Sequence, residues 1–423
     1  MKATTVSFKT LGCRLNQAET ARMRAGFEAA GCRTRPFGEA CDICIIHGCT
    51  VTAKAEKNSR RLARSIKRRH PKTFVIIAGC VAEIGGEKIR RGGADLIANQ
   101  TDKFILPTLL TRHGFQFTPR SESLPPRFDT IRAIVKIQDG CDFRCAYCIV
   151  PDARGQSRSR PSGEILEEIR RLINESGVRE IVLTGANIGC YDDHGTSLVA
   201  LLEQVETQTS VERLRLSSIE LTTAECPIID FMASSATLCR FLHLPLQSGS
   251  DAVLTAMGRR YTTRQYRQAV DYAVRKLGRV GLGTDILTGL PGENAAAFTA
   301  TEQCIESLPF SNLHVFAYSP RPGTPAARMN GQIAASEKKR RLARLIELGY
   351  RKRMEFVRQW IGREVSVLIE AVDADGWGTG WTGEYLPAQV HGRNLRPNTI
   401  IRFKPETVSG KSLIGTAPLP LGT

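Results

Sequence analysis

Three cysteines in the middle of the chain have the spacing of iron–sulfur ligands. Cys141, Cys145 and Cys148 stand in the segment GCDFRCAYC, in the pattern C-x3-C-x2-C. Three thiolates can hold three of the four irons of a cubane cluster, which leaves one iron open to bind a small molecule. The alternative is a structural zinc site, but such sites use four protein ligands, usually in close pairs. The spacing therefore predicts a reaction site built on a [4Fe-4S] cluster.

A second set of cysteines lies in the N-terminal third of the chain. Cys13, Cys49 and Cys80 each follow a glycine and close a short apolar run rich in β-branched residues. Such runs are typical of buried parallel strands, and helical stretches separate them, so we expect a βαβαβ unit. The carboxyl ends of parallel strands meet at one edge of a sheet, which would bring the three thiols together. Each alone would more simply be a core residue, but as a set we interpret them as ligands of a second cluster.

The first set also carries a family resemblance. With the aromatic residue Tyr147 before its last cysteine, it resembles the cysteine motif of the radical S-adenosylmethionine (SAM) enzymes. The following segment, IVPDARGQSRSRP, is similar to the methylthiotransferase branch of that superfamily. The resemblance implies that the open iron binds SAM and that an electron from the cluster cleaves SAM to methionine and a 5′-deoxyadenosyl radical. It makes the three cysteines catalytic metal ligands and Tyr147 a SAM contact.

Composition and charge agree with a large cytoplasmic enzyme that has a polyanionic partner. The 423-residue chain has no signal-peptide core at its start and no apolar run near the ~18 residues that cross a bilayer, so we expect no membrane contact. Its 13 cysteines are spaced for metal rather than for disulfides. The net charge is +17, and residues 54–72 hold nine basic side chains against one acid. A second basic helix is expected over 338–358, with an apolar stripe of Leu342, Leu345 and Ile346. Charge runs are usually solvated faces, but we expect RNA phosphates along at least one of these helices.

The fold class indicated is α/β, in three parts. Residues 1–117 predict an open parallel-sheet domain, and the proline-rich residues 118–130 a linker. Residues 131–360 alternate strands and helices and predict a partial (βα)6 barrel, similar to radical SAM cores, with the cluster cysteines just beyond the first strand. The six strand candidates are 131–137, 180–183, 214–217, 241–244, 280–287 and 313–317. Residues 361–423 predict a small β-barrel, since Gly, Pro and Thr interrupt several short strands.

Part of this last region resembles a known RNA-binding module. GWTGEYL, at 380–386, is similar to a segment of the TRAM domain, a barrel appended to tRNA-modifying enzymes. Trp377, Trp381 and Tyr385 could stack on bases or fill the barrel core. We take Trp381 and Tyr385 as candidates for RNA binding.

The resemblance to methylthiotransferases therefore covers nearly the whole chain. TLGCRLNQAET and CTVTAKAEKNSR, around the first two cysteines, are similar to the branch that acts on N6-threonylcarbamoyladenosine in tRNA. The isopentenyladenosine branch has a GCQMN-like opening and the ribosomal-protein branch a GCPKN-like one. The chain departs from the family at His47, since HGC stands where Asn-Thr-Cys is usual.

The resemblance also implies further site residues in the core. LTGANIGCY, at 183–191, is similar to the family loop at the methionine end of SAM. It implies Gly185 and, further along the core, Glu220 as SAM contacts. Arg154 and Arg158 are expected to meet RNA phosphates.

The implied reaction adds a methylthio group to C2 of the adenine at position 37 of tRNA. The cluster on the N-terminal cysteines would carry or donate sulfur, which one SAM methylates, while the other cluster cleaves a second SAM. The C2–H bond offers nothing to a general base, so the radical of a cofactor is needed. The partners implied are the tRNA anticodon loop, a sulfur donor and a flavodoxin- or ferredoxin-like electron donor. The alternatives are a methylthiotransferase for isopentenyladenosine or a ribosomal protein and, from another class, an iron–sulfur RNA-binding redox sensor without catalysis.

Overall fold

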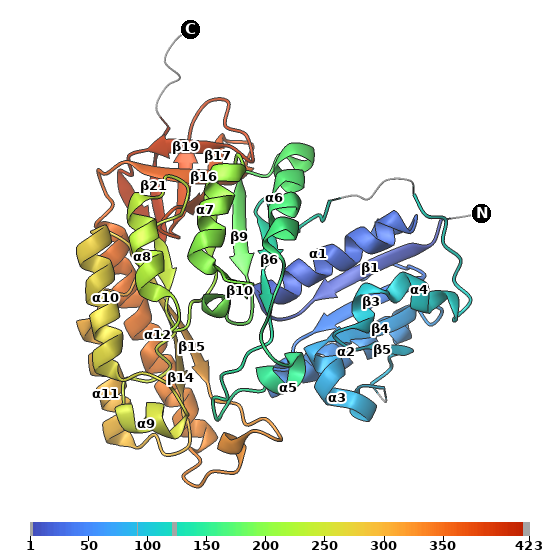
Figure 1. Cartoon of the computed structure of the whole chain (residues 1–423), viewed down its shortest axis with the longest axis horizontal. Coiled ribbons are helices and arrows are strands. Elements are labelled where there is room, and N and C mark those ends of the chain that lie inside the picture. Colours follow the sequence, from blue (N-terminus) through green and yellow to red (C-terminus); the bar gives the residue numbers. More distant parts are fainter. Residues whose placement is uncertain (1–2, 91, 121–124, 418–423) are drawn as a thin grey trace.

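The computed structural model describes residues 3–90, 92–120 and 125–417, with the backbone alone at 87, 88 and 90. Its elements form three groups (Figure 1): an N-terminal domain in blue and cyan, a core in green to orange beside it, and a C-terminal sheet in red over one end of the core. In the part of the chain that the structure describes, no helix is both long enough and apolar enough to cross a membrane.

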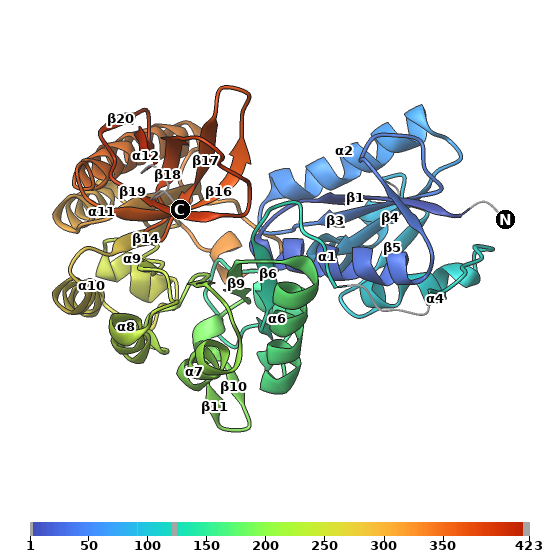
Figure 2. The same cartoon turned by 90° about the horizontal axis from the view of Figure 1, so that it is seen from above.

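The N-terminal domain is a five-stranded parallel sheet in the order β2-β1-β3-β4-β5, which contains the three predicted parallel strands as β1, β3 and β4 and adds β2 and β5 at its edges. Helices α1 and α2 lie on opposite faces of the sheet (Figure 2). Ile45 of β3 packs on the α1 side and its neighbour Ile46 on the α2 side, which explains why this strand is apolar throughout. The elements are β1 (Thr5–Thr10), α1 (Arg14–Ala29), β2 (Arg33–Arg35), β3 (Ile43–Gly48), α2 (Ala53–Arg69), β4 (Phe74–Gly79), α3 (Cys80–Arg90), β5 (Leu96–Ala98), a 3-10 turn (Asp102–Phe104) and α4 (Leu106–Thr111).

The core contains all six predicted strands, in two parallel sheets ordered β12-β9-β6 and β13-β14-β15. Main-chain hydrogen bonds join the two sheets between β12 and β13, including Ile219 N to His243 O at 2.9 Å. No strand pairing among the described residues joins β6 to β15, so the barrel is partial and β15 is an edge strand. The strands are β6 (Ala133–Lys136), β9 (Glu180–Thr184), β12 (Arg213–Leu216), β13 (Phe241–His243), β14 (Gly281–Thr288) and β15 (Asn312–Ala317).

Helices cover the outside of this barrel (Figure 1). They are α6 (Ser162–Ser176), α7 (Leu198–Gln208), α8 (Glu225–Ser234), α9 (Asp251–Ala256), α10 (Thr263–Leu277), α11 (Ala295–Ser307) and α12 (Ala335–Arg358). Shorter elements lie near the ends of the strands, namely β7 (Gln138–Asp139), α5 (Val150–Arg154), β8 (Arg158–Ser159), β10 (Asp192–Asp193), β11 (Thr196–Ser197) and the 3-10 turns Ile188–Cys190 and Pro325–Ala327.

The two basic helices differ in what their charges do. On α2, the side chains of Arg61, Arg64 and Arg68 are exposed, as predicted. On α12 the predicted apolar stripe is partly wrong, because Ile346 is 54% exposed while Leu348 is buried instead. Arg341 of α12 is also buried and donates to the Glu293 carboxylate at 2.8 Å. Only α2 therefore offers an uninterrupted basic face.

The C-terminal group is one six-stranded sheet in the order β19-β16-β17-β18-β21-β20, with β19 and β20 at its edges. Its core includes Phe356, Val357 and Trp360 from the end of α12, so the sheet packs directly on the last helix. A β-rich C-terminal region is thus confirmed, but no pairing among the described residues joins β19 to β20, so the strands form an open sheet rather than the closed barrel that a small β-barrel would give. Its strands are β16 (Val365–Val372), β17 (Trp377–Thr382), β18 (Pro387–His391), β19 (Ile400–Phe403), β20 (Thr407–Ser409) and β21 (Ser412–Thr416).

The predicted linker contacts the N-terminal domain at both of its ends. Arg120 N donates to Ala29 O at 2.8 Å, and Asp129 pairs with Arg24 at 2.9 Å. Residues 121–124, between these contacts, lie outside the described residues.

Candidate active site

The first cysteine set lies on the loop between β7 and α5, beyond the end of the first barrel strand. Gly140 permits this loop, since it has φ +70° and a Cβ there would lie 1.9 Å from Gln156 O. Phe143 N donates to Cys141 Sγ at 3.4 Å, and Arg259 Nη1 donates to Cys145 Sγ at 3.2 Å. Hydrogen bonds to sulfur are a usual feature of cysteines that ligate iron–sulfur clusters.

The second set lies where the sequence predicts it, at one edge of the N-terminal sheet. Cys13 precedes α1, Cys49 follows β3 and Cys80 opens α3 directly after β4. Asn16 Nδ2 donates to Leu11 O at 2.9 Å and to Gly48 O at 3.3 Å, which ties the first two strand ends together. The structure therefore brings Cys13, Cys49 and Cys80 to adjacent strand ends.

The spacing of both sets does not match zinc. Among the described residues, neither set has three sulfurs within 4.8 Å of one another. In a tetrahedral zinc site with Zn–S bonds of about 2.3 Å, the sulfurs would be about 3.8 Å apart. A cubane holds its cysteines farther apart, because each binds a different iron.

Burial keeps several of these thiols protonated. It raises the pKa of Cys49 to about 11 and that of Cys148 to about 12. A metal that binds such thiols must displace their protons. The free energy of the metal–sulfur bonds would therefore have to exceed the cost of deprotonating these buried thiols.

The first cysteine set and one member of the second line a single cavity of about 610 Å³ between the domains, which we call the central cavity. Cys13 lines it from the N-terminal domain, and the residues from the core include all three cysteines of the first set. The predicted SAM contacts Tyr147, Gly185 and Glu220 line it as well. The structure thus gathers at one place the residues that the sequence assigns to the cofactor.

The sequence reasoning missed Arg259, which connects several of these groups. Its guanidinium lies 3.3 Å from Tyr147 Oη and forms an ion pair with Glu220. Burial raises the pKa of Glu220, and Arg259 opposes that rise. The segment MGRRY offered no periodicity or motif that would single out its first arginine.

Arg154 does not lie where a phosphate could reach it, so its predicted contact with RNA is wrong. Its side chain is buried, with Nη1 3.0 Å from Glu19 Oε1 and 2.9 Å from Asp139 Oδ1. Its Nη2 donates to Asn16 Oδ1 at 2.7 Å. Because all these partners are protein groups, Arg154 joins the core to the N-terminal domain. Arg158 is exposed on β8, and its contact with RNA stays a prediction.

Glu19 is the centre of this buried interdomain network. Besides Arg154, it pairs with Lys103 and Lys136, each at 2.7 Å. Burial would raise the pKa of Glu19, but the surrounding cations hold it well below its ordinary value. The Glu19 carboxylate is therefore ionised. A buried charge of this kind destabilises the fold when one of its cationic partners is removed.

The two aromatic candidates of the C-terminal sheet pack on each other, with ring centroids 4.7 Å apart. Tyr385 lines the central cavity, and its hydroxyl accepts a hydrogen bond from Arg14 at 2.7 Å. A base could meet Tyr385 only from within the cavity. The RNA contacts of Trp381 and Tyr385 stay predictions.

His47, where the chain departs from the family pattern, is a buried neutral side chain. Its Nδ1 lies 2.9 Å from Thr20 Oγ1 and 3.1 Å from Asn16 O. Burial lowers its pKa to about 3. Its ring lies against Gly79, the residue before Cys80, where an added Cβ would come within 2.4 Å of His47 Cδ2.

Comparisons with known proteins agree with this arrangement. Residues 135–305 match the radical SAM superfamily, and residues 5–99 match the uncharacterized protein family UPF0004. The threonylcarbamoyladenosine tRNA methylthiotransferase MtaB of Thermotoga maritima is 34% identical over 417 residues, which cover 95% of this chain and 94% of the relative. The chain belongs to the radical SAM methylthiotransferase family.

Other members of the methylthiotransferase family are similar over comparable lengths. The protein of the same name in Bacillus subtilis is 31% identical, covering 95% of this chain and 93% of the relative. A tRNA-2-methylthio-N(6)-dimethylallyladenosine synthase of Thermodesulfovibrio yellowstonii is 29% identical, covering 98% of this chain and 99% of the relative. Among solved structures, the radical SAM methyltransferase TsrM of Kitasatospora setae shares the fold, with a TM-score of 0.59 at 15% identity over 77% of each chain.

As a radical SAM methylthiotransferase, the protein is an enzyme that uses SAM and a [4Fe-4S] cluster. The residues of the core fit these groups. Three thiols and no fourth cysteine ligand leave one iron open, and the central cavity is large enough for a ligand of the size of SAM.

Proposed function

We propose that this enzyme adds a methylthio group to C2 of N6-threonylcarbamoyladenosine at position 37 of tRNA. The observation that carries the proposal is that the three cysteines of the first set and Cys13 of the second set, on different domains, line one cavity. Relatives named for this substrate cover 95% of the chain at 34% and 31% identity. The second candidate is the dimethylallyladenosine reaction, for which a relative at 29% identity is named.

In this proposal each cysteine set holds one [4Fe-4S] cluster. Cys141, Cys145 and Cys148 hold the cluster that binds SAM, while Cys13, Cys49 and Cys80 hold the cluster that supplies sulfur. The fit of the second cluster is supported by donors aimed at its sulfurs, since Val51 N lies 3.4 Å from Cys49 Sγ and Gln100 Nε2 lies 3.4 Å from Cys80 Sγ.

The bound cluster and SAM supply radical chemistry that can remove hydrogen from an unactivated C–H bond. The chain's own residues position the reactants. Tyr147, Gly185 and Glu220 contact SAM, and Arg259 holds the Glu220 carboxylate beside the first cysteine set. The two domains enclose the cavity and limit the access of water to it.

The tRNA approaches along the basic face of α2, which begins directly after cavity residue Thr52. Arg61, Arg64 and Arg68 would follow the phosphates, and Arg158 offers a further exposed cation. A flavodoxin- or ferredoxin-like protein supplies electrons, and a separate donor renews the sulfur.

The decisive test is mass spectrometry of tRNA nucleosides from cells that lack the gene, with and without complementation. We expect the 2-methylthio form to disappear and N6-threonylcarbamoyladenosine to accumulate, because the enzyme acts on that nucleoside. Loss of methylthio-isopentenyladenosine instead would move the enzyme to the second candidate. Unchanged tRNA nucleosides would point to a ribosomal protein or to an RNA-binding redox sensor. The sensor would also release no 5′-deoxyadenosine under anaerobic reduction.

Replacing Gly12 by alanine should remove the second cluster and spare the first. Gly12 has φ +111°, and a Cβ there would lie 2.7 Å from Cys49 Cβ and 3.1 Å from its sulfur. Backbone strain of this kind costs about 1–3 kcal/mol, and the clash would push Cys49 out of place. We expect iron to fall to about four per chain, the content of one cubane, with loss of methylthio transfer but retention of SAM cleavage.

Gly26→Ala is the matched control. It lies in the middle of α1, and a Cβ there meets nothing within 4 Å. Iron content should be unchanged, and stability should rise slightly. If Gly12→Ala kept the iron content of the unmodified enzyme, the N-terminal cysteine set would not hold a cluster.

A further inference from the structure

Two of the large apolar side chains that are exposed line the central cavity. Val51 is 54% exposed and Phe316 is 50% exposed. The other exposed large apolar side chains among the described residues are Ile105, Ile346, Tyr350 and Ile361, and none of these lines the cavity. Apolar surface left open inside a pocket marks a place that a ligand covers.

The alternation of β15 directs Phe316 into the cavity. Leu313 and Val315 pack against the main hydrophobic core of the barrel. Since successive side chains of a strand point to opposite faces, His314 and Phe316 point the other way, and both line the cavity. Their rings are 6.5 Å apart. The edge strand of the barrel thus offers an aromatic wall.

The orientation of His314 is fixed by a chain of hydrogen bonds. Arg353 Nη1 donates to Asn312 Oδ1 at 3.1 Å, which leaves the amide nitrogen to donate to His314 Nε2 at 2.9 Å. The proton of neutral His314 is therefore on Nδ1, which donates to Asp285 Oδ1 at 3.2 Å. Asp285 and His314 are direct partners across β14 and β15.

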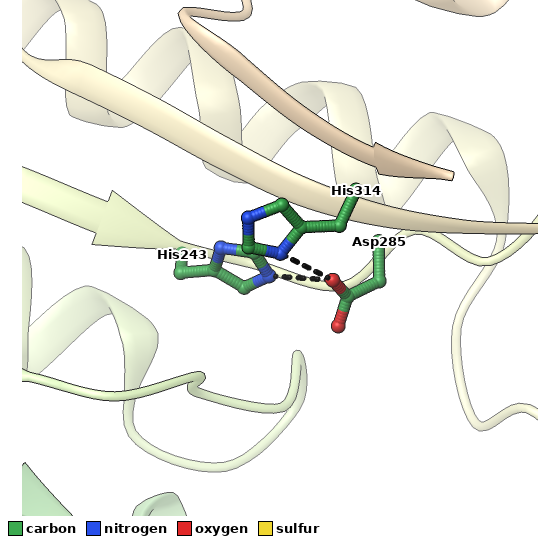
Figure 3. A group of neighbouring side chains, drawn as sticks. All are labelled: His243, Asp285 and His314. Carbon is green, nitrogen blue, oxygen red and sulfur yellow. Dashed lines mark hydrogen bonds and ion pairs between the residues drawn. The ribbon is translucent and has the colours of Figure 1, made fainter. Parts of the chain in front are cut away.

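These residues and His243 also have the composition of a metal site, but their hydrogen bonds oppose that use. Figure 3 shows both imidazoles directed at the same oxygen of Asp285, with His243 Nε2 at 3.1 Å. A metal on His314 Nδ1 would have to displace its proton while Asn312 still donates to Nε2, which would leave the ring without either proton. The network instead holds the imidazole as a rigid, neutral part of the wall.

The opposite side of the cavity is fixed to this wall across the domain boundary. Val51 follows Thr50, whose hydroxyl accepts from buried Arg321 at 2.9 Å. Ala53 N donates to Ser319 Oγ at 3.4 Å, three residues after Phe316. Because these bonds connect the segment of Val51 with the segment that follows β15, both apolar side chains are held on the lining of one cavity, and we call the part that they line the slot.

We propose that this slot receives the adenine base of the target nucleotide, with the Phe316 ring as its stacking face, His314 edge-on beside that ring and Val51 as a further apolar side. The inference rests on the proposed function and deepens it. A flat, uncharged ring suits a slot with an aromatic wall, and an unpaired loop nucleotide can be splayed out to reach it. Arg14 lines the same cavity and α2 begins beside it, so cations are placed for the backbone of an RNA. Val51 N lies 3.4 Å from Cys49 Sγ of the second set, and the first set lines the same cavity, so a base in the slot would be near both.

The test uses the iron-loaded, full-length enzyme and an anticodon stem-loop RNA that carries N6-threonylcarbamoyladenosine. For Phe316→Ala we expect KM for this RNA to rise about 10- to 100-fold, the range of one lost base-stacking contact. Phe316→Tyr should keep KM near the original value, while Phe316→Leu, which is apolar without an aromatic face, should resemble alanine. SAM cleavage without RNA is measured for all three variants beside the KM values, so that a change in RNA binding is separated from a general loss of the radical site.

Two further variants complete the design. Ile346→Ala removes an equally exposed apolar side chain on α12, outside the cavity, and should leave KM unchanged. Val51→Ala tests the slot from the other domain and should raise KM several-fold, which keeps the proposal testable if Phe316→Ala fails to fold.

The outcomes separate this inference from the proposed function. If the unmodified enzyme makes no product on this RNA, the proposed substrate is wrong. If it makes product but Phe316→Ala and Val51→Ala keep KM within twofold, or if leucine replaces phenylalanine without loss, the stacking slot is wrong.

Discussion

Cys141→Ala is expected to abolish methylthio transfer, with a loss of at least about 1,000-fold in rate. Cys141 is one of the three thiols on its loop that would hold the cluster, and a cubane with one of its three protein ligands removed should not assemble. Without that cluster nothing in the chain can cleave SAM, so 5′-deoxyadenosine should disappear together with the methylthio product. Anaerobic assays with a reductant, followed by mass spectrometry of both products, measure this directly.

The cysteine control is Cys226→Ala. Cys226 is exposed on α8 and does not line the central cavity. The activity and iron content of the Cys226→Ala protein should equal those of the unmodified enzyme. The Cys141→Ala protein should lose about four irons per chain. Methylthio transfer by the Cys141→Ala protein would disprove the radical scheme.

Arg154→Met is expected to lower the free energy of unfolding by about 3–5 kcal/mol, the cost of removing one partner from a buried ion pair. Glu19 would lose a partner inside an interface where it is only 1% exposed. Since Asn16 binds both Arg154 and the strand ends beside Cys13 and Cys49, the N-terminal site should also lose iron. Thermal unfolding and iron analysis on the same sample measure the two effects.

Arg340→Met is the matched control, because it breaks an arginine–carboxylate pair that is exposed to solvent. Arg340 pairs with Glu337 on α12 at 2.7 Å with 62% of its own side chain exposed. Surface pairs contribute little, so neither the unfolding temperature nor the iron content should change. Equal behaviour of the two variants would mean that the buried network does not hold the domains together.

Strand positions were predictable because each barrel strand is a short apolar run between turn signals. All six candidates lie within a few residues of β6, β9, β12, β13, β14 and β15. The edge occupied by Cys13, Cys49 and Cys80 was predictable for a related reason, since parallel strands end on the same side. Periodicity was less informative for α12, where Ile346 is exposed although it fits the apolar stripe.

Charged residues at domain contacts could not be predicted from local sequence. Arg154 stands in a basic segment that suggests phosphate binding, yet its partners Glu19 and Asn16 are more than 130 residues away in the chain. Arg259 approaches Cys145 and Glu220 only because the barrel closes around the cavity. Such pairings depend on how the domains meet, which no local pattern encodes.

The contact between Tyr385 and Arg14 has a consequence for how the three parts move. Tyr385 stands on the turn after β17, whose carbonyls at Thr382 and Gly383 accept from Arg215 of the barrel at 3.0 and 3.1 Å. Arg14, which binds the Tyr385 hydroxyl, directly follows Cys13. Any displacement of the C-terminal sheet would therefore pull on the residue next to Cys13, a proposed cluster ligand. The C-terminal sheet is thereby joined to both other parts, and through Tyr385 it forms a portion of the cavity wall.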